Sequence, residues 1–417
     1  MNSKKTEVNY TGPFITMVII MSLVGFLTVI NQQFQAPLQK AFLSNAGDLK
    51  NTLSTLITFS FFLAYLLMGS VSAKMVDKIG YRATMVRALG ILILGLGLFE
   101  ASAYQFDQFG TMVSIGTSSV PVAYFIFLIG SFVVGTSMTF LQVVVNPYLV
   151  ACSVPGTSSV QRQTIAGAGN SSLSTLAPLF VAGVIFQGKT EIQIGSLYIP
   201  FAILMVVVAI IAISLSKIHL PEIEGTTAGK DEKLEKSVWS FSHLTLGVIA
   251  IFFYVGVEVA VGANINLYAE SLGFLPTAAA QMAFLYWGGM LIGRLFGSFV
   301  SKIPGNVQLT ITSIGAGVLV IASVFTGNPW LLVGVGIFHS IMWPAIFTLA
   351  IDGLGKYTSK GSGALMLGVV GGAIIPFVQG IAADAMGGWN LTWIIVIIGE
   401  AYLLYYALIG SKVKQKA

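Results

Sequence analysis

Long apolar stretches, separated by short polar connections, run along almost the whole chain. A helix needs about 20 mostly apolar residues to cross a hydrocarbon core about 30 Å thick. Twelve stretches meet this requirement, and the pattern predicts membrane-spanning helices at 14–34, 52–76, 83–103, 122–150, 163–188, 196–216, 243–268, 275–301, 305–325, 329–350, 361–385 and 388–411. We therefore expect an all-α integral membrane protein.

The basic residues are distributed unevenly among the connections. Lys and Arg collect in cytoplasmic loops, and with both termini placed in the cytoplasm 18 of the 21 basic residues fall on that side. Only Lys40, Lys50 and Lys189 fall outside. The distribution predicts twelve transmembrane helices with cytoplasmic termini. It also explains the net charge of +5 without a nucleic-acid partner, because the sequence has no basic patch with interleaved aromatic residues.

One long polar stretch separates the first six predicted helices from the last six. It has mixed charges and little apolar content, so it cannot form a core of its own. We expect an N-terminal six-helix bundle at 1–216, a cytoplasmic linker at 217–242 and a C-terminal six-helix bundle at 243–417. Two bundles joined in this way place a substrate site near the membrane midplane, between halves that rock against each other.

Composition supports a membrane protein and excludes several other classes. Of the 417 residues 55% are hydrophobic and only 9% charged, against roughly 25% charged in soluble domains. The single cysteine, Cys152, excludes an intrachain disulfide and a cysteine-based metal site. The predicted helices contain neither His-rich motifs nor paired carboxylates at helical spacing, so we expect no enzyme, no cofactor and no structural metal.

The connection after the second predicted helix carries a motif. Gly69 is followed eight residues later by Asp77-Lys78-Ile79-Gly80-Tyr81-Arg82. This spacing resembles the cytoplasmic signature of the major facilitator superfamily. We expect Asp77 to hold Arg82 when the cytoplasmic side is closed and to release it on opening, with Arg294 as a further gate residue. The alternative is a tight polar turn that only satisfies the topology.

Further blocks resemble the fucose, glucose and galactose symporter family within that superfamily. They are GFLTVIN at 25–31, LQVVVNPY at 141–148, YVGVEVAVG at 254–262, YWGGMLIGRLFGS at 286–298, SIMWPAIFTLAI at 340–351 and VGGAIIP at 370–376. The resemblance covers almost the whole chain. It implies a major facilitator fold and sugar transport, and we expect a monomer in a bacterial cytoplasmic (plasma) membrane.

Polar side chains inside a membrane span are costly, so they are expected to face the protein interior or a wet cavity. Amides donate and accept hydrogen bonds as sugar hydroxyls do, and indole rings can cover the C–H face of a sugar. The substrate-binding candidates are Asn31, Gln32, Gln142, Asn146, Asn170, Asn264, Asn266, Trp287, Trp343 and Gln379. The alternative for each amide is a bridge between two helices, and for each indole simple packing.

Two positions depart from what the family resemblance implies for coupling. Where that family has acidic residues in the first helix and, in its fucose branch, in the fourth, this chain has Gln32 and Gln142, which cannot cycle a proton. A glutamine in the fourth helix is found in the family's glucose-like branch, whereas Gln32 departs from the family. A glutamine common in the fifth helix is replaced by Gly167. The family's usual coupling chemistry and sugar pocket are therefore not expected to carry over unchanged.

Glu258 is the leading candidate for cation coupling. A carboxyl group enclosed in a low-dielectric interior can exchange a proton near neutral pH, and an ionised one could instead bind Na⁺. His339 is the second candidate, because imidazole titrates in the working range; the alternative for it is donation to a backbone carbonyl.

Other charged groups are predicted to lie near the ends of their spans. Glu100 and Glu400 are expected to be solvated, and Arg294 to lie near the membrane surface. Asp352 and Asp384 are expected at the cytoplasmic ends of the tenth and eleventh spans, as gate or helix-end charges.

Together these features predict a secondary active transporter that imports a hexose or a sugar derivative with Na⁺ or H⁺. An uncoupled sugar facilitator is an alternative, which the missing first-helix acid favours. Efflux of an amphipathic compound is another, which the amide-rich interior disfavours.

Overall fold

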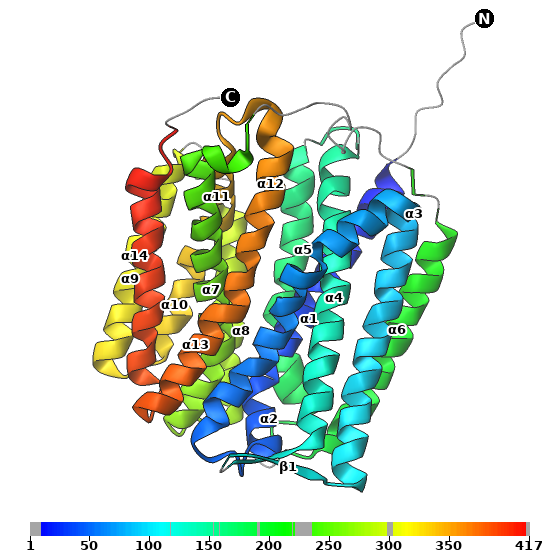
Figure 1. The fold of residues 1–417 in the computed structure, drawn as a ribbon, viewed down its shortest axis with the longest axis vertical. Coiled ribbons are helices and arrows are strands. Elements are labelled where there is room, and N and C mark those ends of the chain that lie inside the picture. Colours follow the sequence, from blue (N-terminus) through cyan, green and yellow to red (C-terminus); the bar gives the residue numbers. More distant parts are fainter. Residues whose placement is uncertain are drawn as a thin grey trace, which may run out of the picture.

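The computed structural model describes residues 10–116, 118–152, 154–157, 159–189, 192–218, 220–221, 236–297 and 303–413. The helices form two bundles that stand side by side (Figure 1). Most of the predicted linker at 217–242 lies outside the described residues, so its prediction stays open.

The first half contains six α-helices, a β-hairpin and three short turns of helix. The α-helices are α1 (Thr11–Gln33), α2 (Gln35–Phe42), α3 (Lys50–Gln108), α4 (Val122–Ala151), α5 (Ser159–Leu179) and α6 (Tyr198–Lys217). The shorter elements are η1 (Gly47–Leu49), β1 (Met112–Ile115), β2 (Ser118–Pro121), η2 (Phe180–Ile185) and η3 (Ile194–Leu197). The strands pair antiparallel, with Met112 opposite Pro121. The sequence pattern did not predict this hairpin.

The second half contains eight α-helices and five short helical turns. The α-helices are α7 (Ser242–Ser271), α8 (Pro276–Gly297), α9 (Gly305–Thr326), α10 (Trp330–His339), α11 (Met342–Ile351), α12 (Thr358–Leu367), α13 (Gly371–Met386) and α14 (Ile394–Tyr405). The turns are η4 (Val238–Ser240), η5 (Gly355–Tyr357), η6 (Gly368–Val370), η7 (Asn390–Trp393) and η8 (Tyr406–Gly410). Two predicted spans are each divided into a pair of helices here, α10 with α11 and α12 with α13.

A single glycine divides α3 into two spans. Gly80 has φ 79° and ψ 174°, a conformation that glycine adopts at little cost and other residues rarely adopt. Of the two apolar spans along α3, 47–76 and 78–108, the break lies at the start of the second. The break explains why a glycine stands at this position of the motif.

The prediction of twelve membrane helices is confirmed. Among the described residues, eleven helical segments are long and apolar enough to cross a membrane. The twelfth is α8, 22 residues long, whose mean hydropathy is lowered by Gln281 and Arg294. Because α8 packs between α5 of the first half and α10 of the second, it can carry Arg294 away from lipid, whereas Gln281 is exposed near the start of the helix.

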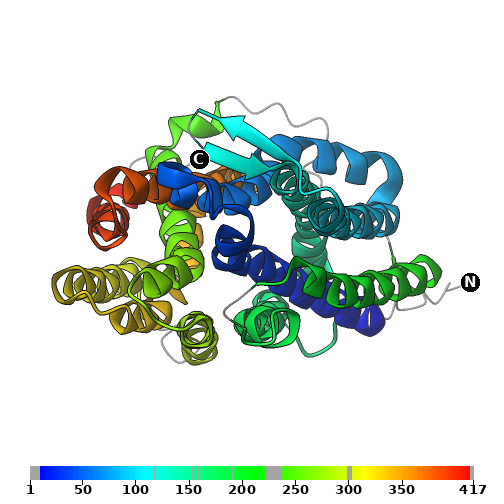
Figure 2. The same ribbon diagram turned by 90° about the horizontal axis from the view of Figure 1, so that it is seen from below.

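The two ends of the bundle differ. The start of α1 and the end of η8 lie at one end, named here the terminal end, and α2 and β1 lie at the other, named the hairpin end (Figure 1). Seen from the hairpin end, the helices form two groups (Figure 2), and the hairpin packs on η1 and α4 of the first half. The halves pack on each other mainly through α3 with α13 and through α5 with α8.

Candidate functional site

At the hairpin end, Asp384 of α13 joins the two halves. Its carboxylate accepts hydrogen bonds from the N–H groups of Asn51 (3.1 Å) and Thr52 (2.7 Å) and from the Thr52 hydroxyl (2.6 Å). These N–H groups belong to the first turn of α3, where they have no partner within the helix. The Trp389 indole Nε1 also donates to the Asn51 side chain at 3.2 Å. We name Asn51, Thr52, Asp384 and Trp389 the hairpin-end clamp.

The position predicted for Asp384 was wrong, although its helix-end role is confirmed. The eleventh span starts at the terminal end, so its last residues lie on the opposite side, at the hairpin end. There the negative carboxylate faces the positive end of the α3 helix dipole, which is a favourable arrangement.

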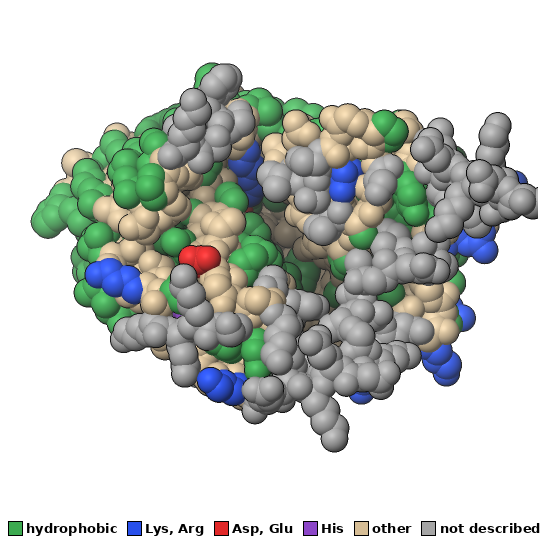
Figure 3. Space-filling model, turned by 90° about the horizontal axis from the view of Figure 1, so that it is seen from above, with side chains coloured by type: hydrophobic (Ala, Val, Ile, Leu, Met, Phe, Trp, Pro, Cys, Tyr) green, Lys and Arg blue, Asp and Glu red, His purple; other side chains and the backbone are tan. Residues whose placement is uncertain are grey.

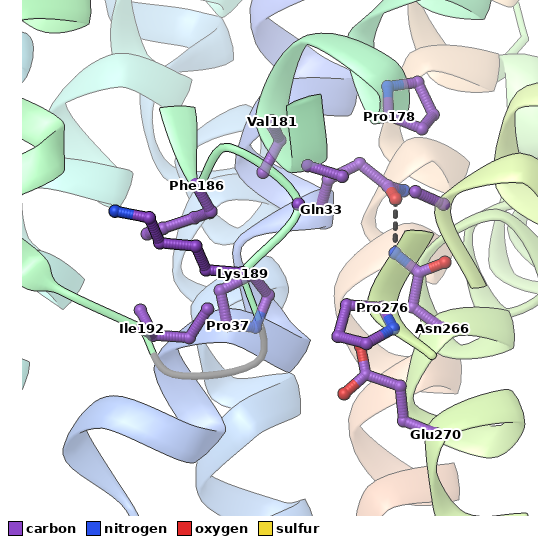
Figure 4. A pocket seen from close by; sticks show the side chains of 13 residues that line it. Gln33, Pro37, Pro178, Val181, Phe186, Lys189, Ile192, Asn266, Glu270 and Pro276 are labelled. Carbon is purple, nitrogen blue, oxygen red and sulfur yellow. Dashed lines mark hydrogen bonds between the residues drawn. The ribbon is translucent and has the colours of Figure 1, made fainter. Parts of the chain in front are cut away.

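An ion pair and a small cavity lie beside the clamp. The Lys40 ammonium in α2 is 2.6 Å from the Glu270 carboxylate in α7, with 38% and 13% of these side chains exposed. Glu270 and Lys189 also line a cavity of about 30 Å³ between the halves (Figure 4). Such a cavity holds one or two water molecules, whereas drug-sized ligands take roughly 300–1,000 Å³. In this conformation the cavity is therefore too small for a sugar, and it belongs to the closed side.

Two amide side chains that line this cavity, Gln33 and Asn266, connect α1 with α7. Gln33 Nε2 donates to the Gly262 carbonyl at 3.0 Å, and Asn266 Nδ2 donates to Gln33 Oε1 (Figure 4). The Trp287 indole covers Gly262, since a Cβ atom there would be 2.5 Å from the ring. Gln33, Gly262, Asn266 and Trp287 form the amide cluster.

Two polar atoms of the amide cluster make no hydrogen bond. Asn266 Oδ1 and Trp287 Nε1 are buried, and neither has a partner among the described residues. A buried polar atom left without a partner costs free energy, and such atoms are suited to a ligand that brings its own donors and acceptors. Asn266 and Trp287 were predicted from the sequence. Gln33 was not, although it directly follows Asn31 and Gln32.

The other predicted amides mostly bridge helices within one half. Asn31 donates to Ser131 (2.8 Å), Gln142 to Tyr65 (2.8 Å), Asn170 to the Met21 carbonyl (2.9 Å), Asn264 to Gln379 (2.8 Å) and Gln379 to Thr392 (3.2 Å). Their contacts match the bridging alternative. Asn31 Oδ1, Gln32 Oε1 and Asn264 Oδ1 nevertheless stay buried without a partner among the described residues.

Two further candidates are half-buried. Asn146 lies on α4 one turn after Gln142. Trp343 stacks on Phe347, with ring centroids 6.4 Å apart, and lies 6.2 Å from the Tyr254 ring. The structure places neither residue in the amide cluster, and a substrate role for them stays a prediction.

Near the middle of the membrane span, Arg294 links the halves. Its Nη1 donates to Ser171 of α5, and its Nη2 lies 4.0 Å from Glu258 Oε1. The expectation that Arg294 lies near the membrane surface was wrong. Side chains on a helix point toward its N-terminus, so this long side chain extends from the end of α8 to Glu258, near the middle of α7.

His339 lies at the centre of a buried hydrogen-bonded group. Its Nδ1 is 2.8 Å from the Tyr286 hydroxyl and its Nε2 is 2.7 Å from Glu400 Oε1. The Tyr286 hydroxyl also donates to the Glu258 carbonyl at 3.0 Å, and the Tyr254 hydroxyl donates to the His339 carbonyl at 3.2 Å. Together with Arg294, these residues form the mid-depth network.

This geometry corrects two expectations. The His339 ring bonds to two side chains and not to a backbone carbonyl. Glu400 is not solvated, because only 2% of its surface is exposed; it lies near the middle of its span (390–410) and not near an end. Glu400 is, after Gln33, a second functional candidate that the sequence prediction missed.

The predicted gate at the terminal end is only partly described. The Asp77 side chain lies outside the described residues, so its contact with Arg82 stays a prediction. The Arg82 guanidinium is exposed and donates to the Ile218 carbonyl, 3.4 Å away, next to the end of α6.

Comparison with known proteins identifies the family. Residues 14–376 match the Major Facilitator Superfamily. The chain belongs to this superfamily. It is 33% identical over 98% of its length to a glucose/galactose transporter of Brucella abortus, of which it covers 96%. It is 24% identical to an L-fucose-proton symporter of Haemophilus influenzae, over 99% of this chain and 100% of that one.

A solved structure shows the same fold. A crystal structure of the Escherichia coli fucose:proton symporter aligns with a TM-score of 0.68 at 22% identity, over 97% of this chain and 100% of that chain. The superfamily match and the twelve helices identify a multi-pass membrane transporter of the bacterial cytoplasmic membrane. The predictions of a transporter, of a major facilitator fold and of no enzyme are thereby confirmed.

Proposed function

We propose that this protein imports a hexose or a hexose derivative together with a proton, by alternating access. The named activities of the relatives, transport of glucose and galactose in one case and of fucose with a proton in another, support a hexose as the solute. The terminal end then faces the cytoplasm, in agreement with the distribution of basic residues.

The amide cluster is the observation that carries the proposal. It lies at the boundary of the two halves, combines two amide side chains with an indole, and contains no charged side chain. Sugar hydroxyls would complete the hydrogen bonds of Asn266 Oδ1 and Trp287 Nε1. The indole ring would cover the apolar face of the pyranose. Asn31 and Gln32, on the same helix as Gln33, also keep unpartnered buried oxygens and are the next candidates for contact.

The conformation corresponds to the cytoplasm-facing state of the cycle. The clamp and the Lys40–Glu270 ion pair close the hairpin end, and Figure 3 shows a hollow between the halves at the terminal end. Transport then requires that the clamp open while the terminal end closes. A ligand changes this equilibrium only if it binds the states with different affinity, so sugar and proton together must favour the intermediate, occluded state.

The mid-depth network supports a proton as the coupling cation. Arg294 places a positive charge 4.0 Å from the Glu258 carboxylate, which opposes the binding of Na⁺ at that carboxylate. Glu258 and His339, both predicted from the sequence, lie in the same network, and each of these side chains can bind a proton. We assign coupling to this network.

The test is uptake by purified protein in liposomes. Radiolabelled D-glucose, D-galactose, L-fucose and N-acetylglucosamine are offered with an inward proton gradient, an inward Na⁺ gradient or neither. We expect one of these sugars to accumulate above equilibrium with the proton gradient, and Glu258→Gln to abolish accumulation. Asn266→Ala should raise KM. Asn264→Ala should change KM much less, because the Asn264 side chain forms its hydrogen bond within the second half.

Other results would select the alternatives. Equilibration without accumulation would indicate an uncoupled facilitator, and accumulation driven by Na⁺ alone would exclude the proton. If no sugar enters under any condition, the proposal of a hexose transporter is wrong.

A further inference from the structure

The most enclosed titratable groups of the mid-depth network are His339 and Glu400. They lie on α10 and α14, 61 residues apart in the sequence, and their side chains are 0% and 2% exposed. We propose that this pair is the site that holds the coupling proton. That this proton is coupled to sugar transport rests on the proposed function. The occupancy of the site, however, can be measured without any sugar.

The hydrogen bonds fix how many protons the pair carries. The single proton of the Tyr286 hydroxyl is donated to the Glu258 carbonyl, so at the 2.8 Å contact His339 Nδ1 must be the donor. The 2.7 Å contact between His339 Nε2 and Glu400 Oε1 needs one further proton. In this conformation the pair therefore shares a single proton and has no net charge.

Loss of that proton would be costly here. An unprotonated Nε2 would point its lone pair at an ionised carboxylate, with no bound proton between them, in a site from which solvent is excluded. A buried charge without compensation is strongly unfavourable. A second proton would leave a net positive charge with the same cost. The enclosed site therefore holds one proton until the surroundings change.

The second carboxyl oxygen indicates where the proton lies. Glu400 Oε2 is buried and has no hydrogen-bond partner among the described residues. An ionised carboxylate would place negative charge on this unpartnered oxygen, whereas in the acid it is a weaker carbonyl acceptor. We therefore place the proton on Glu400 Oε1, donated to a neutral His339 ring.

The groups around the pair place it next to the boundary between the halves. The helices packed nearby supply Tyr254 and Glu258 from α7 and Tyr286 and Arg294 from α8, while α9 carries no titratable residue. The Tyr286 hydroxyl joins His339 Nδ1 to the backbone carbonyl of Glu258, and Arg294 joins the Glu258 carboxylate to the first half. A backbone carbonyl does not pass on a proton, so these contacts position the pair beside Glu258, and proton exchange requires that the pair open.

The backbone beside His339 permits the pair to open. Helix α10 ends at His339 and α11 begins at Met342, with Ile341 outside helical geometry at φ −109° and ψ 1°. A change in the packing of α10 can therefore move the imidazole away from Glu400. The proton balance is simple: the pair binds one H⁺ from outside, carries it neutral through the rocking step, and releases one H⁺ inside when the contact opens.

The test compares wild type, Glu400→Gln and the matched control Glu100→Gln. Glu100 lies half-buried in a span of the first half and outside the network. The glutamine amide at position 400 can donate to His339 Nε2 as the protonated acid does, so this variant should fold and remain permanently in the loaded form. Infrared absorption spectra of wild type and of each variant, recorded at the same pH and without sugar, report protonated carboxyl groups directly.

We expect a carboxylic-acid C=O band that is present in wild type, Glu100→Gln and Glu258→Gln and absent in Glu400→Gln. In liposomes, Glu400→Gln should exchange labelled for unlabelled sugar across the membrane but should lose accumulation driven by a proton gradient. A purely structural role would impair exchange and accumulation together.

Two results would overturn the inference. One is an infrared band that survives in Glu400→Gln, which would place the proton elsewhere. The other is proton-driven accumulation in Glu400→Gln equal to that of wild type. If wild type shows the band but moves no sugar, the proton site stands and the proposed function fails, so the two failures are distinguishable.

Discussion

Replacement of Asp384 by Asn should shift the transporter toward the state that is open at the hairpin end. Asp384 carries three of the hydrogen bonds that cross between the halves, two of them to free N–H groups of α3. Asparagine has a similar shape, but it has one acceptor oxygen in place of two and no negative charge. The closed state should therefore lose stability, while the open state, where both groups meet water, should change little.

The magnitude follows from the contacts that are lost. A hydrogen bond to a charged group contributes about 1.5–3 kcal/mol net, and a charge at a helix N-terminus about 0.3–1 kcal/mol. Because asparagine keeps a weaker acceptor, we expect a loss of about 2 kcal/mol. Since 1.4 kcal/mol corresponds to a factor of ten, the open-to-closed ratio should rise about 30-fold.

The assay is a distance measurement between spin labels across the hairpin end. Ser44 and Ser271 are exposed, lie in different halves at this end, and can be replaced by labelled cysteines in a Cys152→Ser background. We expect Asp384→Asn to populate a longer distance that is rare in the reference protein. The matched control is Asp107→Asn, since the Asp107 carboxylate accepts from Tyr198 at 3.1 Å within the first half.

An unchanged distance distribution in Asp384→Asn would refute the role of the clamp. An equal shift in Asp107→Asn would refute its specificity, because that variant removes a contact that does not cross between the halves.

Three further predictions concern the hairpin end, the packing and the cysteine. Glu270→Gln removes the partner of Lys40. Because the Lys40 side chain is 38% exposed and ion pairs near the surface contribute only about 0–1 kcal/mol, this variant should lengthen the same spin-label distance less than Asp384→Asn does. Gly371→Ala should lower the melting temperature in detergent by several degrees or prevent folding, because the new Cβ would lie 1.8 Å from the Phe252 carbonyl oxygen. Cys152 should react slowly with maleimide at neutral pH until the protein is unfolded in detergent, since burial raises the pKa of its thiol.

Each of these predictions has a control. Gly69→Ala meets no atom within 4 Å and should leave the melting temperature nearly unchanged; equal losses in both glycine variants would contradict the packing argument. A larger shift for Glu270→Gln than for Asp384→Asn would reverse the ranking of the two contacts. Rapid labelling of folded protein would show that Cys152 is accessible.

The membrane helices could be predicted because they depend on local sequence. A span of about 20 apolar residues is recognisable without knowledge of its neighbours, and α8 could be recognised in spite of Gln281 and Arg294. The β1–β2 hairpin was missed because its strands are only four residues each. For Gly80 the sequence motif located the residue, and the structure supplies the reason, because its backbone conformation is one that glycine adopts at little cost.

The site was harder to predict because it consists of contacts between distant helices. Glu258 and His339 could be singled out as costly polar residues in a span. The sequence cannot show that Glu400, in the last helix, faces His339, since that depends on how α10 and α14 pack. Of three successive amides at 31–33, only Gln33 reaches Asn266, and the rotation of α1 that decides this is set by tertiary packing.

The most direct test of proton-coupled sugar transport is the pH change that sugar itself causes. Proteoliposomes are suspended in lightly buffered medium without any ion gradient, and the transported hexose is added outside. Proton symport predicts that the external medium becomes more alkaline as sugar enters and that a proton ionophore abolishes this change. If the His339–Glu400 pair holds the coupling proton, Glu400→Gln should not show the change. Sugar entry at the wild-type rate without any change of external pH would contradict proton symport.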